Sequence, residues 1–151
     1  MKEDIYMIST YDWFWWAILS AFFASLTAIF AKVGLEGIDS DYATLIRTIV
    51  IIIFLAGIVF FSNKWVNPFN AINVKSLSFL ILSGIATGAS WLCYFRALKI
   101  GEASKVAPVD KLSLLLTAIF AFVFLHERPT IREWTGILLV GLGVLILGFK
   151  K

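Results

Sequence analysis

Five long apolar runs occupy most of the chain and decide the solvent in which it folds. They extend over about residues 13–33, 42–61, 77–98, 104–125 and 131–149. A helix needs roughly 20 mainly apolar residues to cross a hydrocarbon core about 30 Å thick, and each run is about that long. In lipid, a charged side chain inside such a helix is costly and usually has a function, so the few charges within the runs carry most of the information.

The composition favours a membrane protein of the all-α class. Of the 151 residues, 60% are hydrophobic and 15% are charged, whereas a soluble domain is about 25% charged. The strands of a membrane β-barrel would be about 10 residues long and would alternate apolar with polar residues. The runs here are continuous and about twice as long, so the sequence predicts a five-transmembrane-helix bundle.

The start of the chain does not have the pattern of a cleaved signal peptide. A signal peptide has about 7–15 apolar residues after a basic segment, whereas the first run is longer and follows Lys2, Glu3, Asp4 and Asp12. The short connections between the runs leave no room for a second domain. We therefore expect residues 1–151 to form a single transmembrane domain.

The loop charges predict an orientation in the cytoplasmic membrane. An odd number of crossings places the termini on opposite sides. The side of the N-terminus carries the basic residues Lys2, Lys64, Lys75, Arg128 and Arg132, and the side of the C-terminus carries Lys32, Arg47, Arg96, Lys99, Lys105, Lys150 and Lys151. The positive-inside rule then predicts a cytoplasmic C-terminus, but the difference is small, and insertion in both orientations stays open.

The charges within the runs all fall in the half of the membrane nearer the C-terminus. Arg47 and Asp110 lie about five and six residues inside their runs, roughly 8–9 Å below the surface. Lys32 and Arg96 are near enough to helix ends to extend to the headgroups. Asp110 is short, and its neighbour Lys111 is about 100° away around a helix, so Arg47 or Lys32 is the expected partner of Asp110. A polar binding site and a structural ion pair both stay open.

Hydroxyl and aromatic side chains extend this charged layer into a polar seam. Asp110, Ser113 and Thr117 share one helix face, and Thr87 and Tyr94 share another, with Trp91 beside them. Such hydroxyls often serve only as hydrogen bonds between helices, but an acid at the end of the stripe favours a solute pathway. The predicted solute- or ion-binding residues are Arg47, Thr87, Trp91, Tyr94, Asp110, Lys111, Ser113 and Thr117.

Pro108 lies two residues before Asp110. A proline inside a helix removes one backbone donor and clashes with the preceding turn, which frees a carbonyl near residue 104. Interrupted helices mark binding sites in many transporters, whereas near a helix start the same proline gives an ordinary kink. Both interpretations stay open.

The last run has no charge in its apolar part and little polar character. Gly136 and Gly143 are seven residues apart and lie almost on one line of a helix. Small residues let helices approach closely in membranes. We expect this helix to serve packing or dimerisation.

No catalytic pattern is present. His126 has no His, Cys or acidic neighbours at ligand spacing, and the sequence contains no phosphate-binding loop, catalytic triad or nucleotide fingerprint. We therefore predict no metal site, no cofactor, no nucleic-acid partner and no enzymatic activity.

Several segments together resemble a known family. Tyr94–Val106, Ala107–Ser113, Phe124–Pro129 and the glycine-rich Gly136–Gly143 are similar to the EamA-type domain of the drug/metabolite transporter superfamily. The resemblance extends over about residues 13–149. The stretches 108–113 and 125–128 are most similar to its five-helix bacterial and archaeal branch.

This resemblance implies one half of a ten-helix architecture, in which two such domains have inverted orientations. The partner would be a second copy of the chain or another five-helix chain, with lipid around both. The implied function is secondary transport of a small metabolite or drug-like solute by alternating access. Small multidrug-resistance relatives use a glutamate in their first helix, and the run 13–33 has none. The alternative is an accessory membrane subunit that moves no solute.

Overall fold

The computed structural model describes residues 2–64 and 73–148, with side chains from residue 12 onward. The helices are α1 (Lys2–Gly34), α2 (Ser40–Phe61), α4 (Val74–Ile100), α5 (Ala103–Asp110), α6 (Ser113–Phe124) and α7 (Ile131–Gly148). No strand occurs in these residues, which confirms the all-α prediction. The expected end of the last helix at residue 149 lies outside the described residues.

The helices have the length and composition of membrane spans. Within the described residues, four segments qualify, namely Asp12–Gly34, Ser40–Phe61, Val74–Ile100 and Ala103–Phe124. The helix α7 is a fifth apolar helix of 18 residues. The observed boundaries lie close to the expected ones, except that α1 begins at Lys2 rather than near residue 13.

The expected helix over residues 104–125 corresponds to Ala103–Phe124, which is long and apolar enough to span a membrane, but a turn at Lys111 and Leu112 divides it into α5 and α6. The amides of Lys111 and Leu112 donate to carbonyls only three residues earlier, those of Pro108 (2.9 Å) and Val109 (3.0 Å). The preceding proline has no N–H to donate to the carbonyl of residue 104. The break therefore lies just beyond Asp110, about two helical turns after the freed carbonyl near residue 104.

Side chains cap the starts of α2 and α7. The Asp39 side chain caps α2 by accepting hydrogen bonds from the amides of Asp41 (3.0 Å) and Tyr42 (3.1 Å). At the start of α7, Glu133 Oε2 accepts from the amide of Thr130 (2.6 Å), and the Glu133 amide donates to Thr130 Oγ1 (3.3 Å). These reciprocal bonds form a capping box.

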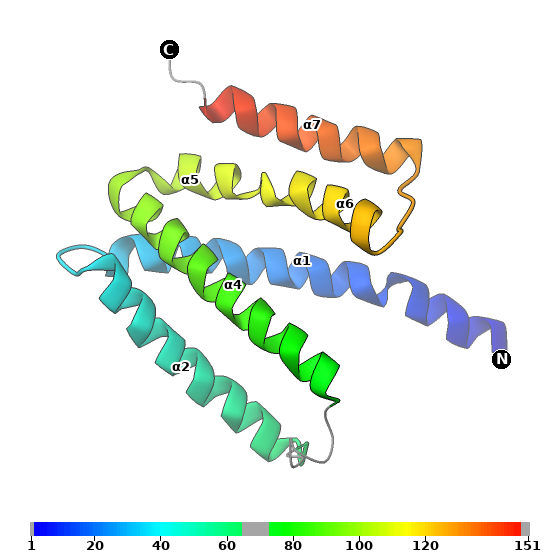
Figure 1. The fold of residues 1–151 in the computed structure, drawn as a ribbon, viewed down its shortest axis with the longest axis horizontal. Helices are drawn as coiled ribbons and strands as arrows, with labels where there is room; N and C mark the ends of the chain where they lie inside the picture. Colours follow the sequence, from blue (N-terminus) through cyan, green and yellow to red (C-terminus); the bar gives the residue numbers. More distant parts are fainter. Residues whose placement is uncertain (1, 65–72, 149–151) are drawn as a thin grey trace.

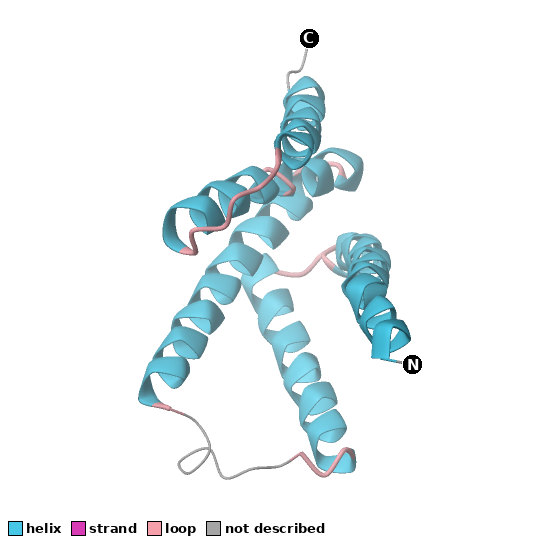
Figure 2. Cartoon of the chain, turned by 90° about the vertical axis from the view of Figure 1, so that its right-hand side faces the viewer, coloured by secondary structure: helices cyan, strands magenta, loops and turns pink. Residues whose placement is uncertain are grey.

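Four helix ends meet at one end of the molecule, which we call the convergent end. It contains the end of α1, the start of α2, the end of α4 and the start of α5, and Figure 1 shows these at the left, opposite the N-terminus. The helix α2 packs on α4, α1 contacts α4 and α5, and α7 lies along α5 and α6. In Figure 2, α2 and α4 meet near this end and spread apart away from it.

The buried core lies at the convergent end. It consists of Ala31, Leu35, Phe95 and Leu98, with Leu98 completely buried. The turn after α4 is tight: a Cβ on Gly101 would lie 2.7 Å from Val106 Cγ2. Glycine therefore allows α5 to start directly against the end of α4.

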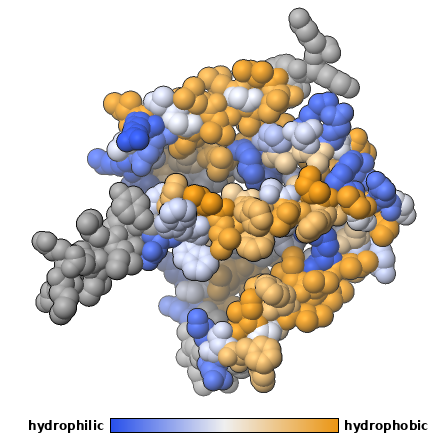
Figure 3. Space-filling view, turned by 180° about the vertical axis from the view of Figure 1, so that it is seen from behind, coloured by the Kyte–Doolittle hydropathy of each residue, from blue (hydrophilic) through white to orange (hydrophobic). Residues whose placement is uncertain are grey.

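Away from this core, the surface is apolar and open. The accessible surface is 12,920 Å², whereas a compact soluble protein of this mass exposes about 7,700 Å². Large apolar side chains face outward along the helices, for example Ile53 and Phe61, which are 67% and 86% exposed. Figure 3 shows apolar side chains over much of one face, with much of the hydrophilic surface towards its edges. This surface fits a bundle of membrane helices.

Candidate functional site

A polar cavity of about 290 Å³ lies between α1, α2, α4 and the end of α5. It brings together five of the eight predicted site residues. They are Arg47, Trp91, Tyr94, Asp110 and Lys111. The other lining residues are Ala24, Thr27, Ile51, Ser90 and Phe95. We call this the polar cavity.

Arg47 is one of the two cations among the described residues that line this cavity. Its guanidinium carbon lies 4.1 Å from the centroid of the Phe95 ring and 5.8 Å from that of Trp91, which are cation–π contacts. Its Nη1 is buried and has no hydrogen-bond partner among the described residues. A buried donor without an acceptor costs about 1–3 kcal/mol. The aromatic rings supply no hydrogen-bond acceptor for Nη1, so an acceptor in the cavity would stabilise Arg47.

Asp110 does not pair with Arg47 or Lys32, and the expectation that it would is wrong. Its Oδ2 lies 3.3 Å from Nζ of Lys111. Lys111 keeps right-handed helical dihedrals (φ −71°, ψ −4°), so the contact comes from its long side chain, which extends to the carboxylate of its neighbour.

Lys32 and Arg96 have protein partners instead of extending freely to the headgroups as expected. Lys32 Nζ donates to the carbonyls of Leu98 (2.7 Å) and Gly101 (2.8 Å) at the end of α4. Arg96 binds Asp41 at the start of α2 through two contacts, Nη2–Oδ2 at 2.6 Å and Nε–Oδ1 at 2.9 Å. Both cations therefore link helices at the convergent end.

Three predicted site residues lie outside the polar cavity. Thr87 is exposed and donates to the carbonyl of Ser83 in its own helix (2.9 Å). Ser113 is exposed just after the break. Thr117 lines a separate cavity of about 570 Å³ between α6 and α7, beside Glu127 and Glu133.

The break explains why the expected stripe over Asp110, Ser113 and Thr117 is divided. Helix spacing of three and seven residues defines one face only in an uninterrupted helix. The turn at Lys111 and Leu112 changes the rotation between the two halves. As a result, Asp110 faces the polar cavity and Thr117 lines the other one.

Five residues that line the polar cavity were absent from the predicted set, and the sequence contains a signal for one of them, Phe95. Phe95 follows Trp91 by four residues, so the two rings share a helix face, and both contact Arg47. Thr27 lines the cavity from α1, and its position there depends on how α1 crosses α4. Among the described residues, no group of three or more His, Cys, Asp or Glu side chains could hold a metal ion.

The charges that line the polar cavity do not balance. Asp110 already has a cation beside it in Lys111, whereas Arg47 has no carboxylate partner among the described residues. The cavity therefore holds one positive charge in excess. Its aromatic walls are suited to the apolar part of a small ligand.

Comparison with known proteins gives a consistent result. The model of the EamA-like transporter family matches residues 12–149. An uncharacterised transporter encoded in the cobO 3′ region of a Sinorhizobium species is 53% identical over 136 residues, which are 90% of this chain and 96% of that protein. The uncharacterised transporter YvbV of Bacillus subtilis is 30% identical over 140 residues, which are 89% of this chain but 44% of that protein.

A more distant relative has a similar length. It is an uncharacterised protein of Methanocaldococcus jannaschii, 25% identical over 134 residues, which are 89% of this chain and 94% of that protein. No solved structure matches the chain.

Proposed function

Because the chain belongs to the EamA-like transporter family, we propose that it carries a small metabolite or drug-like solute across the membrane through the polar cavity. The chain is a multi-pass membrane transporter by its family and its apolar helices. The solute, the route and the mechanism given below are our proposal.

One observation carries the proposed route, namely a charged cavity beside a break in a membrane-spanning segment. Asp110 is the last residue of α5, and the segment Ala103–Phe124 is otherwise apolar enough to span a membrane. Broken helices in transporters expose backbone groups at the binding site and allow the two halves to move separately. In this proposal the turn at Lys111 and Leu112 is the point where α5 and α6 change their relative angle.

Two chains would form the complete transporter and work by alternating access. The chain spans 44% of the Bacillus relative and 96% of the Sinorhizobium relative. Related proteins therefore occur both at about the length of this chain and at about twice that length. A homodimer, or a pair with another five-helix chain, would supply the second half. The excess of Lys and Arg on the side of the membrane that holds the C-terminus supports a cytoplasmic C-terminus in the cytoplasmic membrane. A reporter fused to the C-terminus that fluoresces only in the cytoplasm tests this orientation.

The function is tested with a substitution that removes the acid but preserves its shape. Purified protein is first screened by thermal stabilisation against amino acids, nucleosides, organic acids and cationic drugs, since a ligand that binds the folded state raises its stability. Uptake of a stabilising solute into proteoliposomes is then measured at about pH 6–8. We expect Asp110→Asn to lower uptake roughly tenfold or more, because it leaves Lys111 without its counter-charge.

Asp12→Asn is the matched control, since Asp12 is exposed in the first half of α1, outside the polar cavity. It should transport at the wild-type rate. Wild-type uptake by Asp110→Asn would contradict the assigned role of Asp110. If no solute stabilises the protein and the Asp110 variant instead loses its assembly in size-exclusion chromatography, the chain is an accessory subunit.

A further inference from the structure

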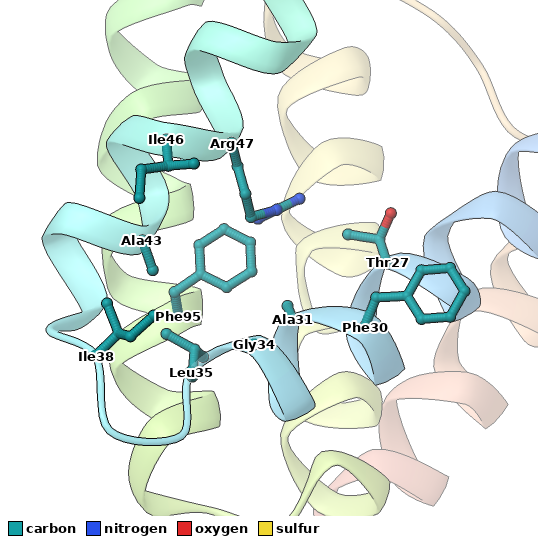
Figure 4. A pocket seen from close by; sticks show the side chains of 10 residues that line it. All are labelled: Thr27, Phe30, Ala31, Gly34, Leu35, Ile38, Ala43, Ile46, Arg47 and Phe95. Atoms are coloured by element: carbon teal, nitrogen blue, oxygen red, sulfur yellow. The ribbon is translucent and has the colours of Figure 1, made fainter.

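A second cavity, of about 380 Å³, meets the polar cavity at Arg47 and lies between α1 and α2. We call it the apolar cavity. The two share Thr27, Arg47 and Phe95. Figure 4 shows Arg47 extending from α2 across the Phe95 ring towards α1, while Leu35 and Ile38 lie nearer the connection between the helices. Arg47 therefore lies at the junction of the polar cavity and the apolar cavity.

The lining of the apolar cavity would exclude a charged group everywhere except at Arg47. Among the residues that the structure describes, Arg47 and Thr27 are the only polar side chains that line it, and the rest are aliphatic or aromatic residues and one glycine. Its rim is accessible, because Phe30 and Ile46 are 68% and 43% exposed. An apolar body fits this space, and a polar end would be placed at Arg47.

The charges near Arg47 determine the sign of that polar end. Asp110 is paired with Lys111, and Lys32 is bound to two carbonyls. Asp41 is bound to Arg96. Arg47 is left with aromatic faces and a buried Nη1 that has no acceptor among the described residues. A carboxylate matches a guanidinium in charge and geometry, whereas an ammonium would be repelled.

We propose that this joint site binds amphipathic organic monocarboxylates, with the carboxylate at Arg47 and the apolar body in the apolar cavity. This inference rests on the proposed function and names its substrate class. Nη1 is buried in the present arrangement, so binding requires the guanidinium to turn away from the Phe95 ring towards the carboxylate.

The charge requirement is tested with three ligands of one shape. Binding of 4-phenylbutyrate, its neutral amide and the cation 4-phenylbutylamine is measured in phosphatidylcholine nanodiscs. A hydrogen bond to a charged group contributes about 1.5–3 kcal/mol, so we expect the acid to bind roughly tenfold or more tightly than the amide. Arg47→Gln should remove this preference, and Lys75→Gln, an exposed lysine at the start of α4, should keep it.

The apolar requirement is tested by filling the cavity. Gly34 lines it, and a Cβ there meets no atom within 4 Å, so Gly34→Leu adds a side chain at the cavity wall with no close contact at its Cβ. We expect this variant to bind 4-phenylbutyrate about as weakly as acetate. Gly57→Leu is the matched control, because Gly57 also has open space around it and lines neither cavity. Ile46→Trp fills the same cavity from α2 if Gly34→Leu does not fold.

Several results would overturn the inference. They are equal binding of the acid and the amide, tighter binding of the amine, or unchanged affinity in both Arg47→Gln and the filled variants. Stabilisation by phosphatidylglycerol through Arg47, without binding of the soluble acid, would show that an anionic lipid occupies the site and would also overturn it. The substrate class and the transport function can be refuted independently. Transport of a cationic solute would refute the substrate class alone. Binding of the acid without any uptake would refute the transport function alone.

Discussion

Lys32 shows how a charge in an apolar helix is stabilised without a carboxylate. Its ammonium group donates to the carbonyls of Leu98 and Gly101 at 2.7 and 2.8 Å. The last carbonyls of a helix have no partner within the helix, and a cation there also interacts favourably with the helix dipole. One side chain therefore satisfies the end of α4 and attaches α1 to it.

Replacing this lysine should destabilise the fold. Lys32→Met retains the length of the side chain but removes both hydrogen bonds, so we expect the free energy of unfolding to fall by roughly 1.5–3 kcal/mol. Lys75→Met is the control, at an exposed position in the first turn of α4. The measurement is denaturant unfolding in detergent micelles. Equal stability of the two variants would refute the role of Lys32 as a cap.

At the scale of the elements, α7 is held by close packing rather than by polar contacts. A Cβ on Gly141 would lie 2.7 Å from Leu115 Cδ1 of α6, whereas a Cβ on Gly143 meets nothing within 4 Å. Val144, one turn further on, is also buried. The packed face thus contains Gly141, and Gly143, which the sequence suggested, faces outward.

These two glycines form a matched pair for a packing test. Gly141→Leu should lower the free energy of unfolding by about 1–3 kcal/mol more than Gly143→Leu, because overpacking a close contact has a cost of that order. The two variants have the same composition and the same gain in helix propensity. The same detergent unfolding assay compares them, and an equal loss in both would contradict the observed face of α7.

The sequence predicts the elements well because their signals are local. The length of an apolar run fixes a membrane helix, and Asp39 and Thr130 with Glu133 mark helix starts within a few residues. The pairings were less predictable, because Lys32 and Leu98 are 66 residues apart and their contact depends on how α1 crosses α4. The Asp110–Lys111 pair was missed for another reason, since the angle between neighbours on a helix does not account for the length of a lysine side chain.

At the scale of the molecule, most of the burial outside α7 is at the convergent end, where Lys32, Asp41 and Arg96 also make their contacts. The core and both cavities that contain Arg47 are there, while α2 and α4 spread apart towards the other end (Figure 2). A single chain thus leaves much of its apolar helix surface uncovered. In our proposal a second chain covers part of that surface and lipid covers the rest.

This proposal predicts a specific mass for the purified protein. Light scattering that corrects for bound detergent should give twice the 16.9 kDa of one chain. The physical reason is the large apolar surface that α2 and α4 expose where they diverge. A mass of one chain at all protein concentrations, with full transport activity, would exclude a dimeric transporter.

The most direct test of the account asks whether water-soluble molecules reach the polar cavity from both sides of the membrane. Ser90→Cys places a thiol in the cavity wall, and Leu82→Cys places one on an exposed apolar position of the same helix. Both are made with Cys93→Ser, because Cys93 is exposed. The account predicts that a membrane-impermeant thiol reagent modifies position 90 in right-side-out and in inverted vesicles and leaves position 82 unmodified. No modification at position 90 from either side would contradict it.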